Sequence, residues 1–218
     1  MKILVIGSGR MANALLPALM RAGHEIIGVS SRNKTTGLSL SKHLGCDFYP
    51  VSKKLPEADL VLIAVNDDST IDVAKQLGNS KAVLAHTSGS VSLTELSKKR
   101  KAGVFYPMET LTGNRKTSFK KIPICVEATD EKSLQLLLSA AKSISEEVYV
   151  MDSETRLALH SAAVFTNNFT NHLLGMAEEI SISGGFPFEI LHKLAETTIK
   201  NAFAADPRSV QTGPAKRN

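Results

Sequence analysis

A glycine-rich loop near the start of the chain constrains the fold more than any other feature of the sequence. The segment GSGRMA at residues 7–12 follows the apolar run Lys2 to Ile6 and precedes apolar residues at helical spacing. This is the G-x-G-x-x-A pattern of a dinucleotide-binding βαβ unit, in which a strand and a helix meet at the loop. The pattern predicts a buried strand, a tight turn and a helix within the first 22 residues.

The small residues of this loop each have a physical reason in such a unit. Gly7 makes the tight turn, Gly9 lets the backbone approach a pyrophosphate, and Ala12 lets the helix pack closely on the strand. The helix start then directs unpaired N–H groups and the positive end of its dipole at the phosphates. A purely structural glycine turn is the alternative. The candidate dinucleotide contacts of the loop are Gly7, Ser8, Gly9, Arg10 and Met11.

The second predicted strand, Glu25 to Ser30, ends in a way that favours NADP(H) over NAD(H). An NAD enzyme usually places Asp or Glu at this end, where the carboxylate accepts a hydrogen bond from the ribose 2′-hydroxyl. Here the strand ends in Ser30, Ser31 and Arg32. Hydroxyl groups and a guanidinium suit a 2′-phosphate, because Arg can bind it through two hydrogen bonds. The alternative is that Arg32 is a surface residue past a strand end.

Three further strand ends supply candidate contacts. The apolar run Asp59 to Val65 leads into Asn66, the run Ala82 to Ala85 leads into a small polar turn, and the run Gly103 to Tyr106 ends on a phenol. In a doubly wound sheet these carboxyl ends lie at the ligand crevice. We expect Ala64, Val65 and Asn66 to line the ribose and nicotinamide, and Ser88 and Tyr106 to orient a substrate. A plain turn is the alternative for Ser88.

Strand and helix patterns alternate up to about residue 152, which predicts an α/β fold with a doubly wound, mostly parallel Rossmann sheet. After that point no strand pattern appears. A long apolar helical run extends to about Ser183, and a second helix is predicted over Phe188 to Ala204. We therefore expect a dinucleotide-binding domain at residues 1–152 and a smaller all-helical domain at residues 153–218 that binds substrate or forms a dimer.

Polar residues fall on one face of the long helix predicted after Ser153. Asn167 is seven residues from His160, and seven steps of 100° come to within about 20° of two full turns. Buried amides and imidazoles need partners, so this stripe must face water, another polar helix or a ligand. We expect His160 to face the cleft as a general acid or base and Asn167 to orient the substrate. For Asn171 and His172, a helix–helix or dimer interface is an equal alternative.

Composition excludes several classes of function. The 218 residues are 43% hydrophobic and 22% charged, as in globular proteins, and no apolar run approaches the 18 residues of a membrane helix. The net charge is +5, and its basic clusters lack the interleaved aromatic residues of a nucleic-acid site. The two cysteines are too few for a disulfide scaffold, which favours the cytoplasm. The spacing of the histidines supports no metal site. The basic clusters are Lys53-Lys54, Lys98 to Lys101 and Lys120-Lys121.

Six segments carry a resemblance to a known family: MKILVIGSGRMA, ADLVLIAVNDD, AHTSGS, FYPMETLT, LHSAAVFTNNFTNHL and QTGPAKR. Together they resemble a family of uncharacterised bacterial Rossmann-like NADP oxidoreductases. That family is related to pyrroline-5-carboxylate reductase and to the deazaflavin-dependent NADP oxidoreductases. The resemblance covers essentially the whole chain, and HSAAVFTNNF and GPAKRN are its more specific segments.

The resemblance implies an arrangement like that of 6-phosphogluconate dehydrogenase, in which a helical domain packs with a second subunit to form a homodimer. It also implies that the long helix and the loop at Gly213-Pro214 meet around the substrate. The helical part would be completed by a second subunit or by residues beyond Asn218. Two motifs of the relatives are missing, since residues 153–183 hold no lysine and the chain has no Gly-Gly-Thr-Thr loop. The resemblance thus implies a cofactor and a reaction class but no substrate.

These observations predict a cytoplasmic, NADP(H)-dependent oxidoreductase that transfers a hydride to or from a small carbonyl or imine substrate. Its cofactor would supply the hydride, and the protein would supply position and a proton route. A non-catalytic NADP(H)-binding sensor or scaffold is the alternative, because a fold by itself does not determine function.

Overall fold

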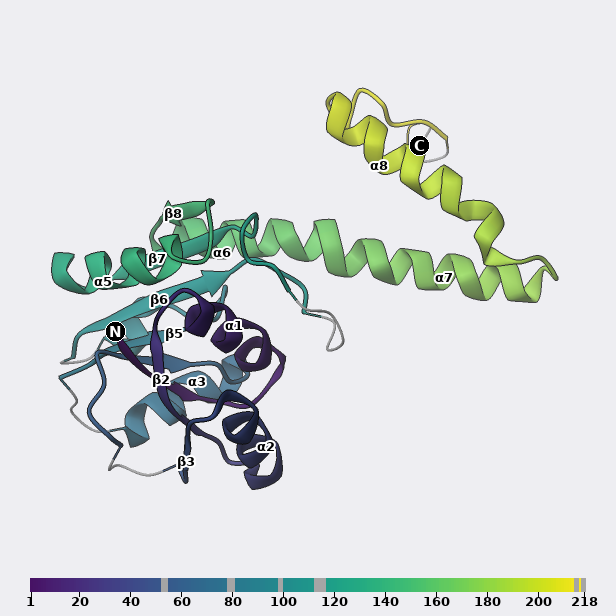
Figure 1. Cartoon of the computed structure of the whole chain (residues 1–218). Coiled ribbons are helices and arrows are strands. Elements are labelled where there is room, and N and C mark those ends of the chain that lie inside the picture. Colours follow the sequence, from purple (N-terminus) through teal and green to yellow (C-terminus); the bar gives the residue numbers. More distant parts are fainter. Residues whose placement is uncertain (52–54, 78–80, 98–99, 112–116, 214–215, 217–218) are drawn as a thin grey trace. The chain divides into compact units, whose positions relative to one another are not determined.

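The chain folds into an eight-stranded sheet covered by helices, followed by a run of further helices (Figure 1). The computed structural model describes residues 1–51, 55–77, 81–97, 100–111, 117–213 and 216. Two compact units are present, Met1–Ala163 and Val164–Asn218. The predicted class, a mostly parallel Rossmann sheet followed by helices, is confirmed.

The sheet has the strand order β3-β2-β1-β4-β5-β6-β7-β8. Only β6 and β7 pair in an antiparallel manner, and the other neighbours are parallel. The order reverses between β1 and β4, which is the switch point where open α/β sheets bind ligands. The strands are β1 Lys2–Ile6, β2 Glu25–Ser30, β3 Asp47–Tyr49, β4 Leu60–Ile63, β5 Val83–His86, β6 Ala102–Pro107, β7 Ile124–Ala128 and β8 Val148–Val150.

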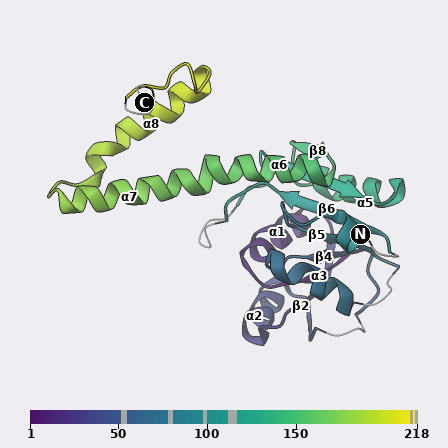
Figure 2. The same ribbon diagram turned by 180° about the vertical axis from the view of Figure 1, so that it is seen from behind.

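Helices cover both faces of this sheet, as the two opposite views show (Figures 1 and 2). Helices α1 (Arg10–Arg21), α2 (Lys34–Leu44) and α5 (Glu131–Lys142) contribute to one buried cluster, and α3 (Asp67–Gln76) and α4 (Leu93–Leu96) to the other. Alternate residues of β1 divide between them, Ile3 in the first and Leu4 in the second. Because both faces are covered, the central strands read as continuous apolar runs.

One helix starts earlier than its sequence pattern indicates. The pattern predicts a short helix over Leu38 to Leu44, but α2 begins at Lys34, because the Asn33 side chain accepts a hydrogen bond from the Thr36 N–H and caps the first turn. Strand β3 was not predicted at all. Its three residues at the sheet edge are too few to show a pattern in the sequence.

The first compact unit extends past the predicted boundary at residue 152 and includes helix α6, Ser153–Ala163. The reason is a buried cation: Arg156 is 1% exposed and forms an ion pair with Glu127 of β7. This side chain ties the helix to the sheet. The division of labour between residues 1–152 and 153–218 stays a prediction.

The second unit contains a π-helix, η1 (Val164–Phe169), then α7 (Thr170–Ser183), the 3₁₀-helix η2 (Phe188–Leu191) and α8 (His192–Ala204). The π-helix was not predicted. A turn of π-helix contains about one residue more than a turn of α-helix. Side chains after Val164 therefore point in other directions than a regular α-helix of 100° per residue would give them. The polar stripe predicted along one uniform helix therefore does not keep its register past Val164.

None of the described helices is long and apolar enough to span a membrane. Three sequence predictions lie outside the described residues: the basic pairs Lys53-Lys54 and Lys98-Lys99, and Pro214 of the loop near the chain end.

Candidate functional site

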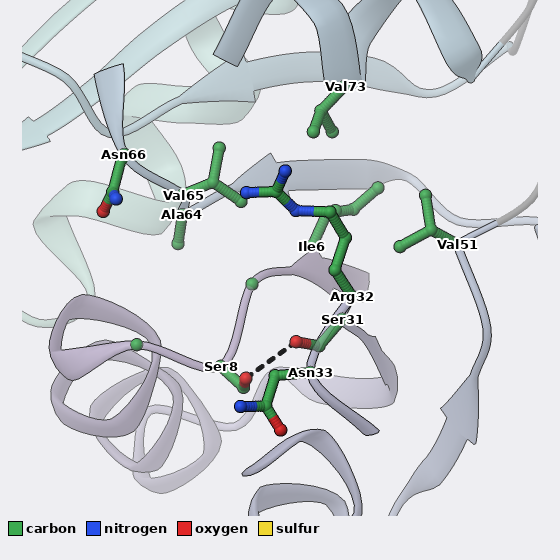
Figure 3. Close-up of a pocket in the computed structure, with 12 residues that line it drawn as sticks. Ile6, Ser8, Ser31, Arg32, Asn33, Val51, Ala64, Val65, Asn66 and Val73 are labelled. Carbon is green, nitrogen blue, oxygen red and sulfur yellow. Dashed lines mark hydrogen bonds between the residues drawn. The ribbon is translucent and has the colours of Figure 1, made fainter. Parts of the chain in front are cut away.

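A pocket of about 280 Å³ lies at the carboxyl ends of β1, β2 and β4, beside the switch point of the sheet (Figure 3). This is the place where a doubly wound sheet binds its ligand. The lining residues are Ile6, Gly7, Ser8, Gly9, Ser31, Arg32, Asn33, Val51, Ala64, Val65, Asn66 and Val73.

At the base of the pocket, the backbone of Gly7 lies very close to the backbone of Ala64. Gly7 has φ +123°, and a Cβ atom placed on it would lie 2.1 Å from the carbonyl oxygen of Ala64. The Gly7 N–H donates to the carbonyl of Ser30 over 2.7 Å. Only glycine combines this φ with this contact, so the tight turn predicted from the sequence has a clear cause.

Gly9 has the opposite surroundings. A Cβ atom on Gly9 would meet nothing within 4 Å, so open space lies directly beside the start of α1. No side chain caps this helix start, and no acidic residue stands in its first turn. The free N–H groups and the positive end of the helix dipole therefore suit an anion such as a pyrophosphate.

Hydroxyl groups gather on one side of the pocket. The Ser8 hydroxyl lies 2.8 Å from that of Ser31, as Figure 3 shows, and 2.7 Å from that of Thr36 in α2. The exposed Arg32 donates from Nη2 to the Ser69 hydroxyl of α3 over 3.3 Å. This side of the pocket thus offers three hydroxyls and one cation.

A second group of polar residues lies on the same sheet edge, at the end of β6. The Tyr106 hydroxyl is 3.0 Å from Nδ1 of His160 on α6, and the two rings meet edge to face. Burial above all raises the pKa of Tyr106 to about 12, so its phenol stays protonated at neutral pH. We refer to Tyr106 and His160 as the Tyr–His pair.

Gly89 covers the Tyr–His pair. A Cβ atom on Gly89 would lie 2.5 Å from Nδ1 of His160 and 2.7 Å from Cζ of Tyr106. The turn between β5 and α4 must therefore carry glycine at this position for the two side chains to approach each other.

The same turn is held from inside by Ser88 and His86. The Ser88 hydroxyl accepts hydrogen bonds of 3.1 Å from the N–H groups of Ser90 and Val91. The Ser88 N–H donates to Nδ1 of His86 over 3.2 Å. Burial, and secondarily the nearby Arg156, lowers the pKa of His86 to about 4, so this imidazole is neutral. These bonds fix the shape of the turn.

One buried guanidinium joins the turn to the sheet. Arg156 of α6 donates from Nη1 to the Glu127 carboxylate and from Nη2 to the carbonyl of Val91. Nη2 also lies 3.3 Å from the hydroxyl of Ser153, and that hydroxyl donates to Glu127.

Comparison with known proteins places this architecture in a family. Residues 2–88 match the family described as NADP oxidoreductase, coenzyme F420-dependent, and residues 122–218 match a domain of unknown function, DUF2520. A solved structure from Bacteroides fragilis, provisionally named an NADP oxidoreductase, has 33% sequence identity and a TM-score of 0.89. The match covers 99% of this chain and 85% of that one. The chain belongs to the same NADP oxidoreductase family as this Bacteroides fragilis protein.

Two further solved structures share the fold. A protein of Thermotoga maritima has 26% identity and a TM-score of 0.81, and the match covers 99% of this chain and 85% of that one. The 1-pyrroline-5-carboxylate reductase of Streptococcus pyogenes has 15% identity and a TM-score of 0.70, with 99% and 83% covered. No curated protein matches the chain in sequence.

In this NADP oxidoreductase, the pocket is where the pyridine nucleotide fits, because the open space at Gly9 and the uncapped helix start suit its pyrophosphate. Most predicted contacts line it. Arg10, Met11 and Ser30 are not among the lining residues; Arg10 is exposed at the helix start, and Ser30 is buried in β2. The predicted contacts in the lining are Gly7, Ser8, Gly9, Ser31, Arg32, Ala64, Val65 and Asn66.

The predicted substrate residues have different surroundings. Tyr106 and His160 come together, Ser88 uses its hydroxyl within the turn beside them, and Asn167 belongs to the π-helix of the second unit. Among the described residues, no group of three or more His, Cys, Asp or Glu side chains could hold a metal ion.

Sequence reasoning missed several contributors to the site. Asn33 lines the pocket and caps α2, a role that an Asn before a helix could have indicated. Val51 and Val73 come from elements far along the chain, and no local pattern points to them. Arg156 was also missed, because a single cation on a helix usually faces water.

Substitution of the two loop glycines should separate folding from binding. Gly7→Ala forces a strained φ and a clash with Ala64, so it should reduce stability by about 1–3 kcal/mol. Gly9→Ala should leave the melting temperature unchanged but weaken NADPH binding, because its methyl group enters the space beside the helix start. Thermal melts and NADPH fluorescence titrations measure the two effects. Unaltered NADPH affinity in Gly9→Ala would place the pyrophosphate elsewhere.

Proposed function

We propose that this NADP oxidoreductase transfers a hydride between NADP(H) and the carbon of a carbonyl or imine group in a small molecule, with His160 as general acid or base. The observation that carries the proposal is the Tyr–His pair, which lies on the same sheet edge as the nucleotide pocket. Bound NADPH would supply the hydride, and the reaction would then need one proton from the protein.

The proton route begins with Tyr106. Its raised pKa keeps the phenol protonated, so its hydroxyl can donate to Nδ1 of the neutral His160 ring, whose own proton then sits on Nε2. In the imidazolium form both ring nitrogens carry protons, and Nδ1–H donates to the oxygen of Tyr106 instead. Nε2 can then give its proton to a substrate oxygen or nitrogen, as general acids do. Tyr106 thereby sets which ring nitrogen faces the substrate.

Ser88 and Asn167 are the remaining candidates to orient the substrate. Ser88 would act through the turn, whose shape its hydroxyl maintains against the Tyr–His pair. Asn167 would act from the π-helix, a local structure that is often found at functional sites.

The substrate class follows from the chemistry of one proton and one hydride, which reduces a C=O or C=N bond. The shared fold with the Streptococcus pyogenes 1-pyrroline-5-carboxylate reductase supports the inclusion of imines among the candidate substrates. We therefore give imines the same rank as ketones in a substrate search.

Removal of His160 should abolish most of the activity. A screen of imines, ketones and 2-oxo acids, followed by NADPH absorbance, identifies a substrate. On that substrate, His160→Ala should lower kcat by about 10²–10⁴-fold, the usual contribution of a general acid. His24→Ala is the matched control, because His24 directly precedes β2, at the end of the strand away from the pocket, and should leave kcat unchanged. Wild-type turnover in His160→Ala would refute the role of His160.

The preference for NADP(H) over NAD(H) is part of the same proposal. The segment from Ser30 to Thr36 contains no carboxylate, and Ser8, Ser31 and Thr36 bring their hydroxyls together beside Arg32. Arg32 can exchange its long bond to Ser69 for a 2′-phosphate, because a charge-assisted pair is the stronger interaction.

NADPH should accordingly bind more tightly than NADH. A charged hydrogen bond contributes about 1.5–3 kcal/mol, which corresponds to a preference of at least tenfold. Arg32→Ala should remove this preference and leave NADH affinity unchanged, whereas Arg10→Ala serves as a control cation near the loop. Calorimetric titration of both cofactors against the three proteins measures the difference. Equal affinities of the wild-type protein for NADPH and NADH would contradict the proposal.

A homodimer formed through the helical segment is also proposed. Among the described residues of the second unit only Ser181 is buried, while large apolar side chains such as Ile182 (73% exposed) and Phe203 (78% exposed) lie open. Exposed apolar area of this kind marks a protein–protein interface.

We also propose a cytoplasmic location, and the free thiols of both cysteines are in keeping with it.

Charge placed on this apolar surface should dissociate the dimer. Ile182→Glu and Phe203→Glu should each raise the dimer dissociation constant by at least tenfold, or about 1.4 kcal/mol. Leu38→Glu is the control, because Leu38 is an exposed leucine of α2 in the first unit. Sedimentation equilibrium measures the constants. A wild-type protein that sediments at the mass of one chain would refute the dimer.

A further inference from the structure

Arg156 is unusual among the charged residues of the chain because its side chain is almost entirely buried, at 1% exposed. Its partner Glu127 is 16% exposed. A buried ion pair adds little net stability, since the loss of hydration offsets the attraction between the charges. Its better-attested use is to fix one arrangement of packed elements against others.

The guanidinium bonds to each structure that builds the Tyr–His pair. Glu127 lies on β7, which pairs with the strand that carries Tyr106. Val91 lies in the turn that carries Gly89. Arg156 itself lies on α6, the helix that carries His160. One side chain thus holds the strand, the turn and the helix together.

The spacing of the two contacts is matched along the helix and the strand. His160 follows Arg156 by four residues, which places it on the same helix face and about 6 Å further on. Glu127 pairs with Val104, and Tyr106 lies two residues beyond Val104, about 6.8 Å along β6. The distance from the ion pair to the Tyr–His pair is therefore about the same along α6 as along β6. The two pairs attach α6 to the sheet at two matched points.

We propose that Arg156 is the positioning residue of this site: its ion pair with Glu127 sets the register of α6 on the sheet, and so holds His160 at hydrogen-bonding distance from Tyr106. The inference rests on the role of His160 proposed above. A slip of one residue would turn the helix face by about 100° and carry His160 away from Tyr106. The single 3.0 Å bond of the Tyr–His pair does not prevent such a slip by itself. Lysine cannot replace Arg156, because an ammonium lacks the planar fork that reaches Glu127 and Val91 together.

The test follows the hydrogen bond of the Tyr–His pair by NMR, without any substrate. Tyr106→Phe removes the hydroxyl, so it should change the ¹⁵N chemical shift of Nδ1 of His160 in the otherwise wild-type protein. In the double variant Arg156→Met/Glu127→Leu this response to Tyr106→Phe should be lost. The double variant removes both charges, and such apolar replacements usually fold. Its affinity for NADPH should equal that of the wild type, because neither residue lines the pocket.

The matched control removes an ion pair elsewhere. Lys120 and Glu146 form an exposed pair of 3.2 Å, and Lys120→Met/Glu146→Leu should leave the response of His160 to Tyr106→Phe intact. A full response in Arg156→Met/Glu127→Leu would overturn the proposal. If that variant does not fold, Arg156→Lys provides the test with the same expected loss, and a full response there overturns the proposal equally.

A kinetic measurement separates this inference from the proposed function. Once a substrate is known, Arg156→Met/Glu127→Leu should lower kcat by about 10²-fold, with KM for NADPH unchanged. Loss of the NMR response together with full turnover in His160→Ala would refute the acid role and support the positioning role. Loss of turnover in His160→Ala together with an intact NMR response would support the acid role and refute the positioning role.

Discussion

The backbone of Gly7 lies so close to the carbonyl of Ala64 that no side chain fits between them, and the nucleotide pocket depends on this contact. Because β1 pairs with β4 on one side and β2 on the other, the same residue also reaches the carbonyl of Ser30. One glycine therefore joins three strand ends. Only Ser8 and Gly9 stand between Gly7 and the start of α1, so the free N–H groups of the helix lie at the pocket.

The Tyr–His pair is surrounded by groups that are neutral or paired with an opposite charge. The buried cation Arg156 is neutralised by Glu127, the neighbouring His86 is neutral with a pKa of about 4, and Tyr106 is protonated. The Arg156–Glu127 pair, His86 and Tyr106 therefore add no net charge around His160. If His160 is the acid, as proposed, a charge that develops on the substrate would meet preorganised hydrogen bonds there rather than a loose counter-ion.

The sequence predicted those features that local chemistry determines. Glycine spacing after a strand indicated the pyridine-nucleotide pocket, because this feature depends on residues adjacent in the chain. The preference for NADP(H) inferred from the missing carboxylate after Ser30 stays a prediction. Arg156 could not be predicted, since its burial depends on Glu127, 29 residues earlier, and on the Val91 carbonyl, 65 residues earlier. The approach of His160 to Tyr106 likewise spans 54 residues. The π-helix escaped notice because helical periodicity assumes a constant turn angle.

The same contrast explains why the reaction class is easier to infer than the substrate. Hydride and proton transfer need only a nucleotide pocket and one acid, and the pocket and the proposed acid, His160, both lie within Met1–Ala163. Selection among substrates needs walls that enclose the reacting carbon. The second unit leaves its apolar side chains open, so it encloses little space by itself. If a second copy covers these side chains, as proposed, the dimer determines specificity, and variants that dissociate it should lose substrate binding before they lose NADPH binding.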